Sequence, residues 1–488
     1  MPLDLREAAR REMIREGFAP DFPPATGQEL ASLDAAPSLG AGVKDLRHLL
    51  WSSVDNPESR DLDQVEYAEM TGPDQIKVLI GIADVDCLIR QAGPIDLHAS
   101  RNTTSVYCGV TMFPMLPEAV STSLTSLNQA VDRLVVVIEL VVAADGTVAG
   151  RDAYRALIHN HAQLDYPSIG AWLEDRGPAP PKVAAAPALA DQLRLQDRAA
   201  RAMRSQRHRA GALDLETIET TAVTTNGKVT GLSAHRKNRA TMLIEDFMIC
   251  ANVAMAKLLE DRQVSSIRRV VKAPERWDRI VALALALGER LPPEPDSSAL
   301  ARFIAKRRIA DPDHFPDLSI SIVKLMGPGE YEIQRPGQTA DGHFGLAVDD
   351  YTHSTAPNRR YADLVTQRLV KAALAGKPAG YTDVELDEVA ARCTTMEDAA
   401  KKVERTCRKQ AAALYLATRI GETFDAIVTG ANAKGTFVRT LHPPAEGMVV
   451  KGQQGMDVGD RVRVTLVGAN AERGFIDFAG AATEATRR

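Results

Sequence analysis

The segment from residue 53 to residue 64 constrains this chain most, because it carries three carboxylates in one short stretch. Asp55, Asp61 and Asp63 surround a Pro57 that favours a turn, and this turn can fold the first aspartate back toward the other two. Asp61 and Asp63 are two positions apart, so they share one face of an extended backbone. Carboxylates held this close repel one another unless a cation lies among them, and oxygen ligands without His or Cys suit Mg²⁺ or Mn²⁺. A polar surface loop is the alternative, and the rest of the chain must decide between the two.

Length and composition are those of an ordinary globular protein. The chain has 488 residues, 45% hydrophobic and 25% charged, which suggests about two to four domains with sizeable cores. The net charge of −5 argues against a protein that is basic throughout, although local basic patches can still attract an anion. The five cysteines lack metal-finger spacing, and the sequence contains no signal-peptide pattern and no membrane-length apolar stretch. We therefore expect a reduced, cytoplasmic protein without a membrane segment.

Changes in apolar periodicity divide the chain into regions. Residues 1–45 predict a small helical region of one or two short helices. Residues 46–420 alternate strong apolar strands with amphipathic helices, and residues 421–480 change to a period of two; residues 481–488 form a tail. The predicted fold class is α+β, with a mixed catalytic domain whose central β-sheet is surrounded by helices, followed by a C-terminal five-stranded OB-fold barrel.

The predicted barrel rests on five short apolar runs separated by glycine-containing turns. Such barrels often bind single-stranded nucleic acid on exposed aromatic side chains, and Phe437 is the candidate here. A small barrel without a role in RNA binding is the alternative. The five runs are residues 424–430, 435–439, 446–449, 459–466 and 475–478.

A predicted helix start supplies the second chemical feature. Ser354 or Thr355 can cap this helix, and Pro357 suits its first turn. Free N–H groups at a helix start, together with Arg359 and Arg360, form a ready phosphate site.

A predicted helix over residues 191–212 is also rich in arginine. It carries six arginines between residues 194 and 210 against one acid, Asp197. A solvated helix face and a phosphate-contacting face both remain open for this helix.

Together these features indicate phosphodiester chemistry. Carboxylates that hold a metal activate water and neutralise a phosphate, and arginine stabilises the extra charge of the phosphorane-like transition state. The residues alone therefore predict hydrolysis of a phosphodiester, with RNA or DNA as the substrate.

The chain resembles the ribonuclease II family of 3′-to-5′ exoribonucleases, which carry an RNB domain. The resemblance covers residues 46–480 in the family's order, without the two cold-shock barrels that usually precede the catalytic domain. It rests on several motifs that follow one another along the chain, at residues 54–64, 80–85, 114–117, 126–127, 343–347, 351–353 and 355–363, and on the barrel at 421–480.

The resemblance implies roles for individual residues. Asp55, Asp61 and Asp63 fall on three of the family's four signature aspartates and would hold the metal. The fourth position is Gln64, whose amide oxygen is a weaker Mg²⁺ ligand than a carboxylate and can act through water. Arg359 falls on the family's catalytic arginine, with a salt-bridge or core arginine as the alternative.

The resemblance also implies residues that contact RNA. Tyr107 falls on the aromatic that stacks near the RNA 3′ end, and Tyr166 falls near the tyrosine that recognises ribose. Asp246 falls where the family has a glutamate near the 3′ nucleotide; it is one methylene shorter, and Glu245 could substitute. Plain structural roles are the alternative for these side chains. Arg360 and Phe437 complete the predicted RNA-binding set.

The resemblance implies a Mg²⁺-dependent enzyme, with Mn²⁺ as a possible substitute, that hydrolyses single-stranded RNA to nucleoside 5′-monophosphates. We expect a monomer with no organic cofactor and no membrane partner. Contacts to the ribose would exclude DNA, because the 2′-OH is the group that distinguishes RNA. Gln64 motivates a rival hypothesis, a catalytically weak or inactive RNA-binding regulator, and a DNA exonuclease is a second rival.

Overall fold

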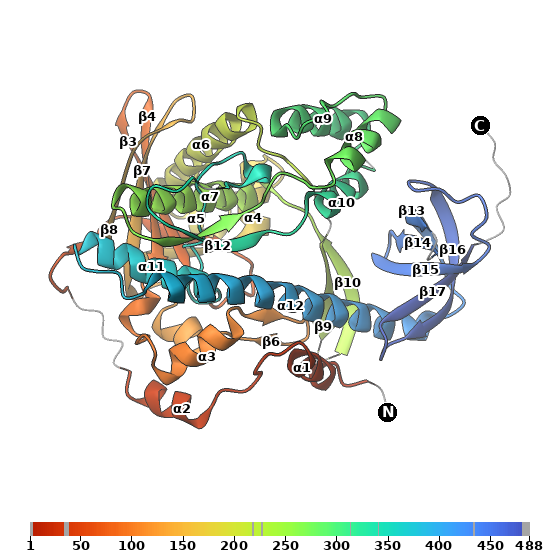
Figure 1. Cartoon of the computed structure of the whole chain (residues 1–488), viewed down its shortest axis with the longest axis horizontal. Coiled ribbons are helices and arrows are strands. Elements are labelled where there is room, and N and C mark those ends of the chain that lie inside the picture. The colour runs from red at the N-terminus through yellow and green to blue at the C-terminus, as the bar shows by residue number, and fades with distance from the viewer. Residues whose placement is uncertain are drawn as a thin grey trace.

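The molecule has a curled β-sheet covered by helices and a small barrel at its C-terminal end (Figure 1). These features come from a computed structural model of the chain. It describes residues 3–33, 39–216, 219–225, 228–312, 314–339, 341–432 and 435–480. The predicted tail at 481–488 lies outside the described residues. The mixed sheet, the surrounding helices and the barrel confirm the predicted α+β class.

Six strands form the central sheet. They are β1 (Val43–Asp45), β2 (Trp51–Asp55), β3 (Gln64–Gly72), β4 (Gln75–Ala83), β7 (Asp132–Ala143) and β8 (Val148–Asp165), in the order β1-β8-β2-β3-β4-β7. Valine and isoleucine dominate β4 and β7, and their side chains fill the main core. The long β8 pairs with β7 along its first part and with β2 along its last part, so the sheet curls back on itself.

The strand ends at one edge of this sheet carry the candidate chemistry. β2 and β8 run parallel and end opposite each other, at Asp55 and Asp165. β3 begins at Gln64, so the acidic segment connects two neighbouring strands at this edge.

Helices surround the sheet, and none of those described is long and apolar enough to cross a membrane. The helices are α1 (Leu5–Arg15), α2 (Pro24–Ala31), α3 (Pro94–Asn102), α4 (Tyr166–Leu173), α5 (Pro181–Ala184), α6 (Pro187–Arg209), α7 (Arg239–Asp261), α8 (Trp277–Ala286), α9 (Ser297–Ala310), α10 (Phe315–Met326), α11 (Tyr361–Leu374) and α12 (Asp383–Leu416). α4, α6 and α7 contact strands of the sheet. α12 crosses the molecule and ends against the barrel (Figure 1).

Three strand pairs and several short helical turns complete the part before the barrel. The pairs are β5 (Val106–Tyr107) with β6 (Met112–Phe113), β9 (Glu219–Thr225) with β10 (Lys228–His235), and β11 (Ser266–Val270) with β12 (Glu330–Gln334). The short turns are Val85–Cys87, Ala119–Leu124, Phe344–Leu346 and Ala417–Arg419.

The C-terminal barrel is closed and has the predicted five strands. They are β13 (Thr423–Asn432), β14 (Gly435–Thr440), β15 (Ala445–Lys451), β16 (Arg461–Asn470) and β17 (Phe475–Gly480). Alternate side chains such as Val438, Val464 and Phe478 fill its own core, which also includes the end of α12. The period of two in the sequence therefore identified these strands correctly.

The predicted helix start at Ser354–Tyr361 is wrong in position. α11 begins only at Tyr361, and residues 357–359 form a turn before it. Ser354 does not cap the helix, because its hydroxyl donates instead to Asn252 Oδ1 at 2.9 Å. This part of the chain therefore meets the acidic segment as a turn and not as a helix N-terminus.

A buried ionic network attaches α11 to the end of β4. Lys371 Nζ lies 2.6 Å from Asp84 Oδ1 and 2.7 Å from Asp86 Oδ2. Arg368, one turn earlier, pairs with Asp86 at 2.9 Å and with Asp96 at 2.8 Å. Since Asp84 is fully buried, its charge depends on Lys371 and on Arg155, whose Nε lies 3.1 Å from Asp84 Oδ2. The network fixes α11, and with it the turn just before the helix, against the sheet.

We expect the Lys371→Met substitution to destabilise the protein by about 3–5 kcal/mol, because it removes one partner of a buried ion pair and leaves Asp84 undercompensated. Chemical denaturation of the intact chain measures the free energy of unfolding. Lys377→Met is the matched control, since Lys377 is exposed just beyond α11. Equal stability of the two variants would contradict a structural role for the network.

Candidate active site

The acidic segment begins with a tight turn at the end of β2. Asp55 Oδ1 accepts hydrogen bonds from the backbone N–H of Asn56 at 2.7 Å and from Ser59 Oγ at 3.0 Å. The side chain of Asp55 thereby stabilises the turn that reverses the chain toward the two later aspartates.

Asp61 and Asp63 lie on one face because Leu62 between them points into the core. Leu62 is fully buried. Its N–H donates to Ser126 Oγ, and its carbonyl accepts from the N–H of Leu127, both at 3.0 Å. The backbone is therefore anchored on the core side, and the two carboxylates face the opposite way, as the two-residue spacing predicts.

The turn before α11 meets Asp63. The backbone N–H of Asn358 donates to Asp63 Oδ1 at 3.1 Å, and Arg359 Nε lies 3.8 Å from Asp63 Oδ2. The N–H of Ser105 donates to the Arg359 carbonyl at 3.0 Å. Arg359 is itself held close to the strand that carries Tyr107.

These segments enclose a cavity of about 610 Å³. Its walls come from the acidic segment, from β5, from the start of α4, from one side of α7, from the turn before α11 and from α12. The lining residues are Asp55, Asn56, Ser59, Asp61, Asp63, Gln64, Tyr107, Tyr166, Thr241, Ile244, Glu245, Met248, Thr355, Arg359 and Glu404.

Burial raises the pKa of two of the aspartates. The pKa of Asp63 rises to about 7 because the group is buried, and the Arg359 guanidinium and the Asn358 N–H lower it only in part. Burial also raises the pKa of Asp61, while Arg359 and the Tyr107 hydroxyl oppose the rise. Arg359 therefore does not offset the cost of burying these carboxylates, and an additional cation would stabilise both of them.

The oxygen donors of this cavity fit Mg²⁺ or Mn²⁺ better than a metal that requires His or Cys. Within the described ranges, no three His, Cys, Asp or Glu side chains are grouped so that they could hold a metal ion, so Asp55, Asp61 and Asp63 line one cavity without forming a preformed three-carboxylate metal site. This arrangement suits Mg²⁺, which keeps several of its waters and binds through one or two carboxylates together with substrate phosphates.

Two tyrosines line the same cavity. Tyr107 is partly exposed, and its backbone N–H donates to Glu404 Oε1 of α12 at 3.1 Å. Tyr166 begins α4, which Asp165 caps through the N–H of Ser168 at 2.8 Å. Two aromatic side chains therefore line the same cavity as the carboxylates and Arg359.

Asp246, Arg360 and Phe437 do not line this cavity. Asp246 is buried and pairs with Arg204 at 2.6 Å and with Arg207, so two of the six arginines in α6 serve a structural ion pair. Its neighbour Glu245, the alternative at this position, does line the cavity. Phe437 lies on the distant barrel, partly exposed.

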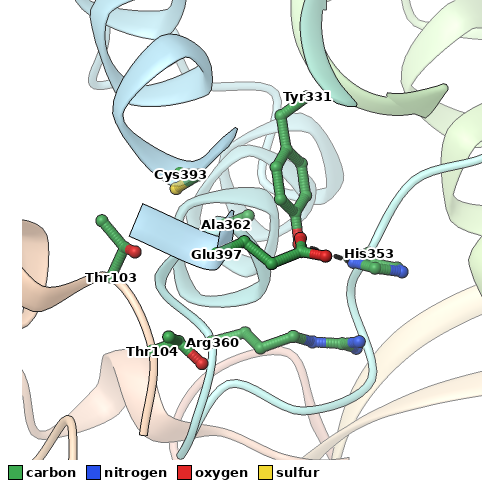
Figure 2. Close-up of a pocket in the computed structure, with 8 residues that line it drawn as sticks. All are labelled: Thr103, Thr104, Tyr331, His353, Arg360, Ala362, Cys393 and Glu397. Atoms are coloured by element: carbon green, nitrogen blue, oxygen red, sulfur yellow. Dashed lines mark hydrogen bonds between the residues drawn. The ribbon is translucent and has the colours of Figure 1, made fainter. Parts of the chain in front are cut away.

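Arg360 lies in a different, smaller cavity of about 100 Å³ (Figure 2). Its Nη2 donates to Asp363 Oδ1 at 2.7 Å. The other polar groups around it include Glu397 and the pair formed by Tyr331 Oη and His353 Nδ1 at 2.8 Å (Figure 2). The two adjacent arginines therefore point into separate cavities, and only Arg359 reaches the carboxylates.

The sequence interpretation did not identify several residues of the site. Glu404 comes from the middle of α12, where no local pattern distinguishes it from the other charged residues of a long helix. Asn358 is buried, and its Oδ1 accepts from Thr125 Oγ1 at 2.6 Å. Its place beside Arg359 was the available signal. The α7 residues Thr241 and Met248 follow the helical spacing of Glu245, which was already a candidate.

Comparisons with known proteins identify the family of this chain. A family model described as the RNB domain matches residues 43–376. A second, described as the RNase II-type exonuclease C-terminal S1 domain, matches residues 422–481. Ribonuclease R of Vibrio cholerae is 28% identical over 501 residues, which cover 94% of this chain and 59% of that relative. The chain thus spans less than two thirds of the relative's length.

Two solved structures share the fold. RNase R of Mycoplasma genitalium, in complex with ribose methylated single-stranded RNA, matches with a TM-score of 0.85 and 23% identity, over 98% of this chain and 78% of that chain. Yeast Ssd1, described as a pseudonuclease, matches with a TM-score of 0.71 and 14% identity, over 94% of this chain and 57% of that chain. The first family model covers most of the sequence, and so the protein belongs to the RNB domain family.

Proposed function

We propose that this protein is a Mg²⁺-dependent 3′-to-5′ exoribonuclease that hydrolyses single-stranded RNA to nucleoside 5′-monophosphates. The observation that carries the proposal is one cavity lined by Asp55, Asp61, Asp63 and Arg359. Ribonuclease R relatives such as that of Vibrio cholerae support the reaction class.

The polar residues beside the predicted metal position have separate roles in this proposal. Among Asp55, Asp61 and Asp63, one or two carboxylates together with an RNA phosphate would hold Mg²⁺, since the described residues form no preformed set of three ligands. When bound, Mg²⁺ would polarise the attacking water and neutralise the scissile phosphate. Gln64 would contribute through water. Arg359, close to Asp63 and partly exposed to the cavity, would stabilise the extra charge of the transition state.

The aromatic residues would position the RNA end. Tyr107 would stack on a base near the 3′ end and determine where degradation stops. Tyr166 would lie near the ribose, whose 2′-OH distinguishes RNA from DNA, and Glu245 is a better candidate than Asp246 for a contact to the terminal nucleotide because it lines the cavity. The binding of single-stranded RNA by the Mycoplasma genitalium relative supports the choice of ligand.

A catalytically weak or inactive RNA-binding regulator is the competing function. Gln64 favours it, and the resemblance to a pseudonuclease shows that this fold also occurs in a protein described as inactive. Three aspartates and Arg359 in one cavity favour the enzyme. A monomer in the cytoplasm, and an RNA-binding role for the barrel through Phe437, remain predictions from the sequence.

Degradation of 5′-labelled poly(A) by the purified protein tests the proposal. We expect Mg²⁺-dependent shortening from the 3′ end with release of AMP, inhibition by a chelator, and no degradation of the matching DNA. Intact RNA that still binds the protein would support the regulator instead. Equal degradation of DNA would overturn the assigned substrate.

Arg359→Ala should lower kcat by about 10²–10³-fold, because a preorganised positive charge at the transition state is lost. Single-turnover cleavage with saturating RNA and Mg²⁺ isolates this step. The control is Arg90→Ala, since Arg90 is exposed and does not line the cavity. A normal kcat in Arg359→Ala would show that Arg359 does not act in the chemical step.

Tyr107→Ala should change the length of the final RNA product and weaken binding of the RNA end, since base stacking contributes about 1–3 kcal/mol. Tyr107→Phe keeps the ring and removes only the hydroxyl beside Asp61, so its product length should match that of the wild type. Gel analysis of the limit products measures both. The same shift in both variants would indicate that the hydroxyl, and not stacking, sets the end point.

A further inference from the structure

Glu66 is a buried carboxyl group that has no role in the proposed chemistry. It lies on β3 and is fully buried, and within the described chain neither carboxyl oxygen has a hydrogen-bond partner. Ser52 lies directly opposite in antiparallel register; its buried hydroxyl also lacks a partner in the described ranges. Buried polar groups in native proteins are nearly always satisfied, so a buried glutamate without a partner calls for an explanation.

Glu66 lies directly behind the wall of the active-site cavity. Gln64, two positions earlier on the same strand, lines that cavity. Alternate residues of a strand share a face and lie about 7 Å apart. Glu66 also interacts electrostatically with Asp55 and with Tyr166, two further lining residues. Glu66 is therefore a carboxyl group that lies behind Gln64, on the side of this residue away from the cavity.

Gln64 needs such a neighbour if its oxygen is to face a cation. A glutamine side chain has one acceptor oxygen and an NH₂ group that only donates, so the amide must be oriented by a partner for its NH₂. An acceptor on the same face of β3, on the side away from the cavity, would fix the amide with its oxygen outward. Glu66 occupies that position and has two oxygens without described partners.

We propose that Glu66 is the fourth acidic group of this site: its oxygens have no partner among the described residues, and when a cation binds, Glu66 would accept the amide N–H of Gln64 and turn the amide oxygen toward the cation. The inference rests on the proposed Mg²⁺-dependent function. It makes Glu66 a positioning residue, because Glu66 acts on the cation through Gln64. It also explains how position 64 can lack a carboxylate: a further carboxyl group lies deeper on the same strand, where burial raises its pKa and a bound cation would favour its charged form.

Isothermal titration of the intact protein with Mg²⁺, in the absence of RNA, tests this role without depending on catalysis. Glu66→Gln keeps the size of the side chain and removes the charge. We expect it to weaken Mg²⁺ binding about tenfold or more, because the new side chain keeps one acceptor oxygen but loses the charge-assisted hydrogen bond behind the metal ligand, and its NH₂ group can compete for the Gln64 oxygen. Glu69→Gln removes a carboxylate that pairs with Lys77 on the same sheet, and it should leave Mg²⁺ affinity unchanged. Unchanged affinity in Glu66→Gln would overturn the proposal.

A double-mutant cycle with Gln64→Asp separates this coupling from a general structural effect. An aspartate at position 64 needs no orienting partner, so adding Glu66→Gln to Gln64→Asp should change the Mg²⁺ Kd by less than about twofold. Equal weakening in both backgrounds would contradict the proposed link. If Glu66→Gln does not fold, Gln64→Leu removes the other partner of the proposed hydrogen bond. Gln64→Leu must then weaken Mg²⁺ binding by a similar factor. Unchanged Mg²⁺ affinity in this variant would also overturn the proposal.

The wild-type protein distinguishes this inference from the proposed function. A wild type that binds Mg²⁺ and degrades RNA, with no effect of Glu66→Gln, would remove only the role of Glu66. A wild type that neither binds Mg²⁺ nor degrades RNA would overturn the proposed function and this inference together.

Discussion

The contact between Asp63 and the turn that carries Arg359 is the interaction on which the site depends. It joins two segments that are 295 positions apart in the sequence. Asp63 is buried, and its pKa is raised to about 7 even with Arg359 beside it. The fold therefore holds carboxylates where their charge is only partly compensated. Such an arrangement is unfavourable for a purely structural ion pair and suitable for binding a cation and a phosphate.

The rest of the catalytic part keeps the two segments in place. Leu62 anchors the acidic segment to the core, and the ionic network around Lys371 attaches α11 to the end of β4. Ser105 holds the Arg359 carbonyl, so the strand with Tyr107 and the turn with Arg359 form one unit. The barrel has its own core and lies at the far end of α12 (Figure 1). The proposed hydrolysis is thus assigned to the catalytic part, and the proposed RNA binding through Phe437 is assigned to the barrel.

Local patterns in the sequence were sufficient for much of this structure. The two-residue spacing of Asp61 and Asp63 predicted their common face, and the period of two after Gly421 predicted the five strands of the barrel. The helix start was misplaced because Pro357 and its polar neighbours suit a turn as well as a helix N-terminus. Local patterns could not separate Arg359 from Arg360, since neighbouring residues of a turn can point into different cavities. Local patterns also could not show that Asp246 forms a structural ion pair, because its partners lie on α6 and only the tertiary fold brings them together.

Anomalous diffraction from crystals grown with Mn²⁺ and an uncleavable single-stranded RNA tests the central claim most directly. We expect a Mn²⁺ peak beside Asp61 and Asp63, a phosphate of the RNA 3′ end between that peak and Arg359, and Tyr107 against a base. A cavity without Mn²⁺ while the RNA lies only on the barrel would contradict it. That result would mean that the carboxylates and Arg359 do not form a phosphate-cleaving site.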